Sequence, residues 1–522
     1  MLVGSLLSQA ARRWPDRAAV KQDSEMLSYR QWNERVNGVA RCMAEKIGIG
    51  KGDRVAVFAF NSLEMITAAF AIQKLGAVYV TINFRLAAEE LRYQLEDADV
   101  KALFYDVDLA EVVGAAAGDV RYLVGLRARA GQPAPYGISF AELCGPCTDE
   151  PKVEIAESDA SLIMYTSGTT GRPKGVVLSH RAQWINTLLC TIELQLSPED
   201  RTLHMAPLFH VAAYHVMLLP HILVGGFNVI LQRFDPDAAL DVLKRERITT
   251  ILGVPTQYDL LAERLQESGS TFPDLRLAVT TGAPIKQETA ARIRERLTPS
   301  LCCVYGLTES TSLLCILPPG EWDRRPEGCI GRTLIGVETR VVTAQDEIDI
   351  DSIVALGSTG ILAAKAPKLM DGYLHNVEKT AERIKDGWII TGDVVVEDEE
   401  GFFQLVDRYD DMIISAGENV YPQEVEQVLL RCPEIADCAV VGIADRRWGQ
   451  AVTAFVVARD PTLTDKTLDA FCLDGRLARY KRPRAYHFVS SIPRNPSGKI
   501  LRKILKEHHT PNITEPKEVT NG

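Results

Sequence analysis

Early in the chain, short apolar runs alternate with longer mixed stretches, a pattern that predicts strands and helices in turn. The apolar runs are Arg54–Phe60, Val78–Asn83 and Lys101–Asp106. The stretches between them, Ser62–Ala77 and Ala87–Asp99, are long enough for helices. Strand–helix–strand repeats of this kind predict a parallel sheet with helical cover, and hence an α/β fold.

From Gly331 the pattern changes to short strands separated by turns, which predicts a small β subdomain. The residues after Asp411 look like a compact α+β domain. Because 522 residues are too many for one hydrophobic core, we expect two domains, residues 1–409 and 410–522. The short strands are expected at Val337–Val342, Gly360–Ala364, Trp388–Ile390 and Phe402–Leu405.

Charge and cysteine content narrow the classes of function. A net charge of −11 argues against nucleic acid as a general partner, because phosphate backbones are bound by basic surfaces. Eleven cysteines without a secretory leader favour reduced thiols in a cytoplasmic protein. The stretch Met205–Gln232 lacks charged residues but contains Pro220 and Gly225-Gly226, so we expect a buried helix and a strand and no transmembrane segment. The oligomeric state stays open, with a homodimer as one option.

The candidate chemistry centres on Tyr165–Lys174, a loop between two apolar runs. Its glycines let backbone N–H groups approach an anion closely, and its hydroxyls and lysine add donors and positive charge. This composition is typical of a polyphosphate cradle, although the glycine spacing differs from that of P-loop NTPases. The candidate binding residues are Thr166, Ser167, Gly168, Thr169, Thr170, Gly171 and Lys174.

The loop resembles the signature loop of the AMP-forming, adenylate-forming enzymes: acyl-CoA synthetases, amino-acid adenylation domains and firefly-type luciferases. The resemblance covers essentially the whole chain, and further motifs follow in the family's order. It implies a ligase that joins a carboxylic acid to ATP as acyl-AMP and releases pyrophosphate. The acyl group then passes to coenzyme A, and AMP leaves. Mg²⁺ is the implied metal cofactor.

Two further motifs supply candidate ligands for adenine and phosphate. The small residues Gly282-Ala283-Pro284 can pack against a flat ring. In the motif that follows, Tyr305 can stack on adenine beside Gly306, and Thr308 can donate to the α-phosphate. Glu309 can hold Mg²⁺, which prefers one or two carboxylates plus phosphate oxygens.

Other roles follow from the resemblance. It assigns Asp393, in a Thr-Gly-Asp motif, to the ribose diol, and Arg408 is a candidate for the ribose and phosphates. Asp410 matches the hinge about which a mobile C-terminal domain swings between the two half-reactions. Lys499, in Pro-x-x-x-x-Gly-Lys, matches the catalytic lysine that bridges the carboxylate and the α-phosphate.

The resemblance also suggests residues for coenzyme A. Arg85 lies in a predicted connection after a strand, where α/β proteins bind ligands, and relatives use such an arginine for the phosphates of coenzyme A. Gly417 matches the loop that lines the pantetheine channel. Trp448, Tyr480 and Arg482 are weaker candidates, chosen because aromatic faces and arginine forks suit a nucleotide.

The motif Pro207–Val211 indicates which class of carboxylic acid is the substrate. Amino-acid adenylation domains usually carry an aspartate where this chain has His210, so an α-amino acid is disfavoured, and His210 is expected to wall the pocket or gate the thiol channel. A mostly neutral, apolar wall fits a benzoate-like aryl acid or a medium-chain fatty acid. The expected pocket residues are His210, Val211, Tyr214, Ala283, Leu313 and Leu314.

Two alternatives stay open. The same adenylation chemistry could load an acyl carrier protein, in which case the coenzyme A residues would be dispensable. A luciferase-like monooxygenase on the same scaffold would need O₂ chemistry, for which the sequence offers no support. The chain departs from the family's pattern at Ala364–Pro367 and at Asp407, and neither departure touches a catalytic role.

Overall fold

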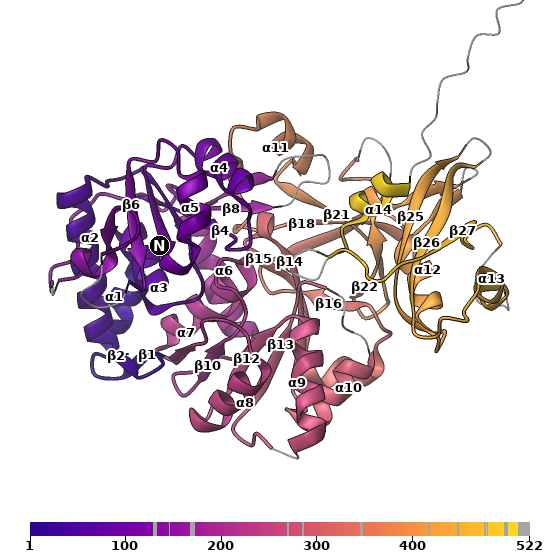
Figure 1. The fold of residues 1–522 in the computed structure, drawn as a ribbon, viewed down its shortest axis with the longest axis horizontal. Coiled ribbons are helices and arrows are strands. Elements are labelled where there is room, and N and C mark those ends of the chain that lie inside the picture. Colours follow the sequence, from indigo (N-terminus) through magenta and orange to yellow (C-terminus); the bar gives the residue numbers. More distant parts are fainter. Residues whose placement is uncertain are drawn as a thin grey trace, which may run out of the picture.

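The computed structural model describes residues 1–128, 133–145, 147–166, 173–268, 271–283, 285, 287–344, 348–415, 418–445, 448–473, 477, 479–494 and 500–509. Within these ranges the chain forms two large sheets with helical layers, followed by a smaller C-terminal α+β region (Figure 1). The predicted α/β class is therefore confirmed.

The first sheet contains the strands predicted early in the chain, in the order β19-β9-β8-β4-β3-β5-β6-β7. Neighbours from β8 to β7 run parallel, whereas β9 and β19 are antiparallel additions. Helices α4 (Ala88–Asp97) and α5 (Ala110–Ala116) pack on one face. The strands are β3 (Arg54–Phe58), β4 (Val78–Ile82), β5 (Ala102–Asp106), β6 (Tyr122–Leu126), β7 (Ile138–Ser139), β8 (Ala160–Thr166), β9 (Lys174–Ser179) and β19 (Gly372–Tyr373).

The second sheet has the order β17-β18-β21-β22-β16-β15-β14-β13-β12-β10-β11-β1-β2, with β20 on β21. It is parallel from β14 to β1 and antiparallel from β14 to β17. Helices α8 (Pro236–Arg245), α9 (Pro255–Ser268) and α10 (Gln287–Arg296) cover the parallel part. Its parallel strands and their edge hairpin are β1 (Ala18–Gln22), β2 (Glu25–Ser28), β10 (Arg201–His204), β11 (Phe227–Ile230), β12 (Thr250–Gly253), β13 (Leu277–Thr280) and β14 (Leu301–Leu307).

The antiparallel strands extend this sheet. The predicted short strands are present, but they continue the second sheet through β16 and β15, so the region is not a separate sheet. Helix α11 (Val377–Arg383) follows β19. The antiparallel strands are β15 (Ser312–Leu317), β16 (Cys329–Thr333), β17 (Glu338–Val342), β18 (Thr359–Lys365), β20 (Ile384–Lys385), β21 (Trp388–Glu397) and β22 (Phe402–Arg408).

The main core joins the two sheets. Residues of both sheets and of the intervening helices belong to one buried apolar cluster, in which the rings of Trp32 and Phe70 meet edge to face, 5.6 Å apart. The helices are α1 (Gly4–Arg13), α2 (Tyr29–Ile47), α3 (Leu63–Lys74), α6 (His180–Glu193) and α7 (Leu219–Val224). Helix α3 is buried on nearly every face, so it lies between the layers, whereas α1 and α2 each keep an exposed polar face.

The C-terminal region has its own sheet, β24-β23-β26-β25 with β27 on β26, drawn in gold in Figure 1. Separate apolar clusters pack on its two faces. A short turn, Tyr409–Asp411, connects it to β22. The elements are β23 (Ile413–Ser415), β24 (Glu418–Val420), α12 (Pro422–Leu429), β25 (Ile435–Asp445), β26 (Gly449–Ala458), α13 (Asp465–Leu473), β27 (Ala485–Phe488) and α14 (Arg502–His509).

The charge-free stretch Met205–Gln232 is buried, as predicted. It contains a π-helical segment, Ala212–Leu218, which continues into α7 and then β11. A π-helical turn is uncommon and tends to occur near functional sites. In the part of the chain that the structure describes, we find no helix with both the length and the apolar character needed to cross a bilayer.

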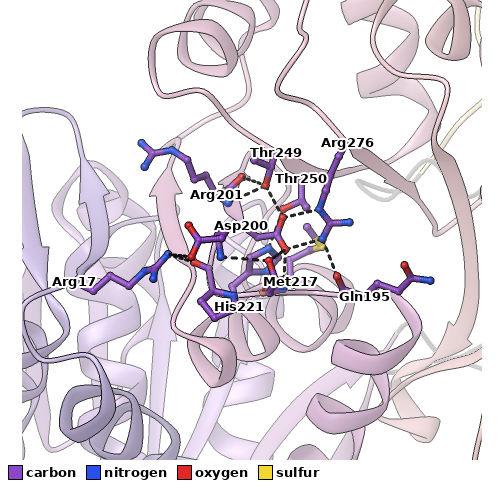
Figure 2. A network of polar contacts seen from close by, with 12 residues as sticks. Arg17, Gln195, Asp200, Arg201, Met217, His221, Thr249, Thr250 and Arg276 are labelled. Atoms are coloured by element: carbon purple, nitrogen blue, oxygen red, sulfur yellow. Dashed lines mark hydrogen bonds and ion pairs between the residues drawn. The ribbon is translucent and has the colours of Figure 1, made fainter.

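A buried polar network fixes the start of the parallel strands of the second sheet (Figure 2). The guanidinium of Arg276 donates to both oxygens of Asp200, over 2.7 and 2.6 Å, and the Thr249 hydroxyl donates to one of them. Beside them, the Nδ1 atom of His221 lies 2.6 Å from the Met217 carbonyl, and its Nε2 atom lies 2.9 Å from the Thr250 hydroxyl. A carbonyl only accepts, so Nδ1 carries a proton, and burial lowers the pKa of His221 to about 4, which keeps the imidazole neutral. His221 therefore supports the sheet through these two contacts.

Candidate active site

The described ends of the phosphate loop are paired strand residues. Thr166, at the end of β8, is the register partner of Lys174, at the start of β9, so the loop is a hairpin connection between two strands. Ser167, Gly168, Thr169, Thr170 and Gly171 lie outside the described residues. A cavity of about 260 Å³ adjoins Lys174 and is also lined by Tyr93 and Lys379.

Glu309 is joined to the end of this loop by an aromatic bridge. The Tyr373 hydroxyl donates to Glu309 Oε1 over 2.8 Å, and the Lys174 ammonium lies 4.9 Å from the centre of the Tyr373 ring. The Met370 N–H donates to the Glu309 carbonyl over 2.8 Å. Glu309 and Thr308 belong to the short turn Thr308–Ser310 between β14 and β15. The turn thus places a buried carboxylate, 7% exposed, next to the lysine that closes the loop.

Three of the predicted nucleotide residues contact one another. Asp393 Oδ1 lies 3.0 Å from Arg408 Nε, and Asp393 Oδ2 accepts a hydrogen bond from the Tyr305 hydroxyl. Asp393 and Arg408 are opposite each other on β21 and β22, so sheet register brings them together. The nearby Asp393 carboxylate holds the pKa of Arg408 above its ordinary value, while burial and the same carboxylate raise the pKa of Tyr305.

The residues after β13 are tied to the last part of β14. The Thr281 hydroxyl donates to the Val304 carbonyl over 2.9 Å, which places Gly282 and Ala283 next to the end of β14. Gly282 has φ +86°, a conformation that side chains rarely adopt. Pro284 lies outside the described residues.

His210 and Arg85 approach each other across an aromatic cluster. The ring of Phe209 lies 4.1 Å from that of His210 and 5.4 Å from that of Phe84, and the Arg85 guanidinium lies 4.6 Å from the Phe84 ring. Burial, together with the positive charge of Arg85, lowers the pKa of His210 to about 4. His210 is therefore neutral at physiological pH, and its Nε2 atom is buried without a hydrogen-bond partner among the described residues.

Of the predicted acyl-pocket residues, Tyr214 lies on the π-helical segment, with His210 and Val211 just before it, whereas Leu313 and Leu314 lie on β15 and Ala283 follows β13. Tyr214 is buried and donates to Gln73 Oε1 over 3.0 Å, and Val211 packs against the main core. Leu313 and Leu314 are both buried. Successive residues of a strand point to opposite faces, so only one of these leucines can line a given pocket.

The predicted coenzyme A residues are divided between the two parts of the chain. Arg85 is exposed in the connection from β4 to α4. On the C-terminal region, Arg482 pairs with Asp469, and Tyr480 is 37% exposed. The ring of Trp448 lies 4.3 Å from the guanidinium of Arg484. Arg482 is thus already paired with an acidic partner of its own domain.

Three other predicted residues have little or no described structure. Asp410 belongs to the turn Tyr409–Asp411, where the chain passes from β22 to the C-terminal sheet. Gly417 and Lys499 lie outside the described residues. The position of Asp410 is that expected of a hinge, and its role stays a prediction.

Sequence reasoning missed several residues that support the site. Asn61 donates to the Ala206 carbonyl over 3.0 Å and accepts from the Leu208 N–H over 2.8 Å, which fixes the segment leading to His210. Tyr373 and Arg484 were also missed. The partners of Tyr373 and Arg484 are distant in sequence, so motif spacing gave no signal for either. Only Asn61, which directly follows the predicted strand Arg54–Phe60, stood at a position that the sequence could indicate.

The chain is similar to known proteins over nearly its whole length. A model of the AMP-binding enzyme family matches residues 7–374, and a model of the AMP-binding enzyme C-terminal domain matches residues 424–499. Feruloyl-CoA synthase from Amycolatopsis sp is 35% identical over 503 residues, covering 96% of this chain and 97% of that protein. The 2-succinylbenzoate–CoA ligase of Bacillus cereus (strain ATCC 10987 / NRS 248) is 34% identical over 505 residues, covering 96% and 98%.

Solved structures extend the similarity to three dimensions. The o-succinylbenzoate CoA synthetase from Bacillus subtilis, in complex with its acyl-adenylate intermediate, superposes with a TM-score of 0.84 at 28% identity, covering 96% of this chain and 98% of that one. The same enzyme in complex with ATP and magnesium ion gives a TM-score of 0.82. The chain belongs to the AMP-binding enzyme family and is an AMP-forming acid–thiol ligase.

Proposed function

We propose that the chain activates an aryl carboxylic acid with ATP and transfers the acyl group to coenzyme A. The observation that carries this proposal is the convergence of Tyr305, Asp393 and Arg408 near the strand end that bears Glu309. The neutral His210 removes the fixed charge that an amino-acid substrate would need. The names of both relatives specify an aromatic acid, which favours an aryl acid over a medium-chain fatty acid.

In the first step, a carboxylate oxygen attacks the α-phosphorus of ATP, and the bond to pyrophosphate breaks. Anion meets anion in this step, so cations and hydrogen-bond donors must already be in place. We assign the β- and γ-phosphates to the loop from Thr166 to Lys174. Thr308 donates to the α-phosphate, and Lys499 bridges it to the carboxylate.

The donor set fits magnesium. Glu309 is a buried carboxylate with one oxygen bonded to Tyr373, and Mg²⁺ needs only one or two carboxylates when phosphate oxygens complete its shell. When bound, the ion would neutralise charge on the phosphates. The Tyr373 hydroxyl fixes the orientation of the Glu309 carboxylate, and the Met370 N–H fixes its backbone.

The adenosine would lie between β13, β14 and β21. Asp393 already accepts from Tyr305 and Arg408, and each carboxylate oxygen has a further lone pair for a ribose hydroxyl. We assign the small residues Gly282 and Ala283, which follow the Thr281–Val304 contact, to packing against the flat base.

In the second step, the thiol of coenzyme A attacks the acyl carbon, its proton passes to solvent, and the bond to AMP breaks. We assign Arg85 to the phosphates of coenzyme A and His210 to the entrance of the thiol channel. A swing about Asp410 would withdraw Lys499 and bring Gly417 to the channel, with Trp448, Tyr480 and Arg482 near the nucleotide. The domain boundary at residue 410, the cytoplasmic location and a homodimer stay predictions.

The test is AMP formation from ATP over benzoates, cinnamates, medium-chain fatty acids and amino acids, each with and without coenzyme A. We expect turnover that requires both an aryl acid and coenzyme A. Pyrophosphate exchange without stimulation by coenzyme A would move the acceptor to a carrier protein. Activity confined to amino acids, or none with any acid, would contradict the proposal.

A further inference from the structure

A lysine that the sequence analysis did not single out is fully buried behind the candidate site. Lys368 lies between β18 and β19, and its side chain has no exposed surface. Its ammonium donates to Asn186 Oδ1 over 3.1 Å, to the Ser310 carbonyl over 3.0 Å and to the Leu313 carbonyl. An ammonium has three donors, so these three neutral oxygens use all of them.

Such a placement is costly. Removing a charge from water without a carboxylate partner destabilises the charged form, and burial lowers the pKa of Lys368 to about 8. The titratable groups that face it are the thiols of Cys190 and Cys315 and the imidazole of His215, whose own pKa is lowered to about 3 by burial. A methionine would fill the same space without this cost. The ammonium is therefore expected to have a specific task.

Its two carbonyl partners bracket a strained turn. Thr311 has φ +51° and Ser312 has φ +88°, and both are residues that rarely adopt the left-handed region. Ser310 and Leu313, on either side, give their carbonyls to Lys368. In return, the Thr311 hydroxyl donates to the Lys368 carbonyl. The strained turn directly follows Thr308 and Glu309, so holding the turn also holds them.

The third partner leads to the acyl side of the site. Asn186 lies on α6, and its Nδ2 atom donates to the His215 carbonyl over 3.2 Å. His215 belongs to the π-helical segment that carries Tyr214 and begins just after His210. One ammonium thus connects the turn after Glu309 to the segment that forms the predicted acyl wall.

We propose that Lys368 is a positioning residue that holds the Thr308–Glu309 turn and the acyl-pocket wall in a fixed relation. This inference rests on the proposed function, because it takes the assigned roles of Thr308, Glu309 and Tyr214 as given. Lys368 touches neither substrate nor metal; it acts through the two carbonyls and Asn186.

The test compares Lys368→Met with Lys365→Met, a matched change of an exposed lysine on β18. Acid-dependent pyrophosphate exchange is measured with each, together with the thermal unfolding midpoint. A shift of about 1 Å in a site can cost about 100-fold in rate, so we expect Lys368→Met to lose about 10- to 100-fold in kcat and to raise the KM for the acid. The control should match the unsubstituted enzyme.

The pH profile separates positioning from bulk stability. As the pH rises through about 8, the amine of Lys368 loses a proton and retains two donors for three acceptors. The rate of pyrophosphate exchange by the unsubstituted enzyme should therefore fall above about pH 8. This alkaline decline should be missing in Lys368→Met. A lower unfolding midpoint with unchanged kcat, KM and alkaline decline would overturn the proposal.

Asn186→Leu supplies a second variant if Lys368→Met does not fold. It leaves the two carbonyl contacts and cuts the connection to α6, so the KM for the acid should rise at least about fivefold while kcat changes less. An unchanged KM for the acid in Asn186→Leu would overturn the proposed connection between Lys368 and the acyl-pocket wall. An unsubstituted enzyme that shows no exchange with any acid would instead contradict the proposed function.

Discussion

The N-terminal and C-terminal parts of the chain organise their candidate residues differently. In the N-terminal part, residues from distant strands contact one another, as Tyr305 and Arg408 do at Asp393. In the C-terminal part, Arg482 binds Asp469 of its own domain, and Trp448 packs against Arg484. The candidate nucleotide residues thus contact one another, whereas the candidate coenzyme A residues of the C-terminal part contact neighbours of their own, and the proposed thiol site would need residues from both parts.

Burial disfavours the charged form of titratable groups in both parts of the chain. The buried histidines of the N-terminal part are held neutral, and burial lowers the pKa of His204, His210 and His221 to between about 3 and about 4. Near the connection between the two parts, burial likewise disfavours charge, raising the pKa of Asp407 to about 6 and that of Glu426 to about 7, although Arg502 lies close to both. Burial therefore opposes charge in both parts of the chain, although an arginine lies close to these two carboxylates.

The largest expected effect comes from Lys499→Ala. Losing the group that bridges carboxylate and α-phosphate should slow adenylation about 100- to 1000-fold, the scale of removing a key charge-stabilising donor. Pyrophosphate exchange measures this step. Thioester formation from supplied acyl-AMP should change little, and Lys503→Ala, an exposed lysine on α14, is the control. Equal loss of both half-reactions would contradict the division between domains.

Asp393→Asn should have the next largest effect. The substitution weakens two charge-assisted contacts within the protein and those expected with ribose, so kcat/KM for ATP should fall about 10- to 100-fold. Steady-state kinetics with varied ATP measures it. Glu399→Gln, an exposed carboxylate in the same β21–β22 hairpin, should leave kcat/KM unchanged. A change confined to the KM for coenzyme A would contradict the assignment of Asp393 to the ATP site.

Arg85→Ala sharpens the thiol side of the comparison. Loss of one guanidinium–phosphate contact should raise the KM for coenzyme A about tenfold and leave pyrophosphate exchange intact. Arg121→Ala is a close control, because that exposed arginine also packs on a neighbouring aromatic ring, Tyr122. If exchange fell and the KM for coenzyme A did not change, Arg85 would belong to adenylation.

The smallest effect concerns stability. His221 has a folded pKa of about 4 and an ordinary value of 6.5, so its neutral form stabilises the fold above pH 6.5, and this contribution is lost as the pH falls. His221→Gln should therefore be less stable than the unsubstituted chain at pH 7.5. The difference in unfolding free energy should shrink by about 2 kcal/mol by pH 5. A difference that is constant with pH would show that His221 is not buried in its neutral form.

The sequence predicted the elements whose patterns are local. The alternating strands and helices from Arg54 to Asp106 are confirmed, because each strand and helix carries its own apolar pattern. Motif order also indicated the residues that meet at Asp393. The continuation of the second sheet through β16 could not be predicted, since strand pairing across some 70 residues leaves no local signal.

Supporting residues were equally hidden. Lys368 looks like any surface lysine in the sequence, and only its contacts with Ser310 and Asn186 reveal its burial. The pairing of Arg482 with Asp469 depends on the approach of α13 to the segment before β27. Both are products of tertiary packing.

The central claim, that the two half-reactions use different arrangements of the two domains, is tested most directly by Asp410→Pro. Fixing φ at the turn between β22 and the C-terminal sheet should block the swing. Pyrophosphate exchange and coenzyme A-dependent thioester formation are measured on the same preparation. The account predicts that exchange persists while thioester formation falls at least about 100-fold. An equal loss of both activities, or the loss of neither activity, would contradict the account.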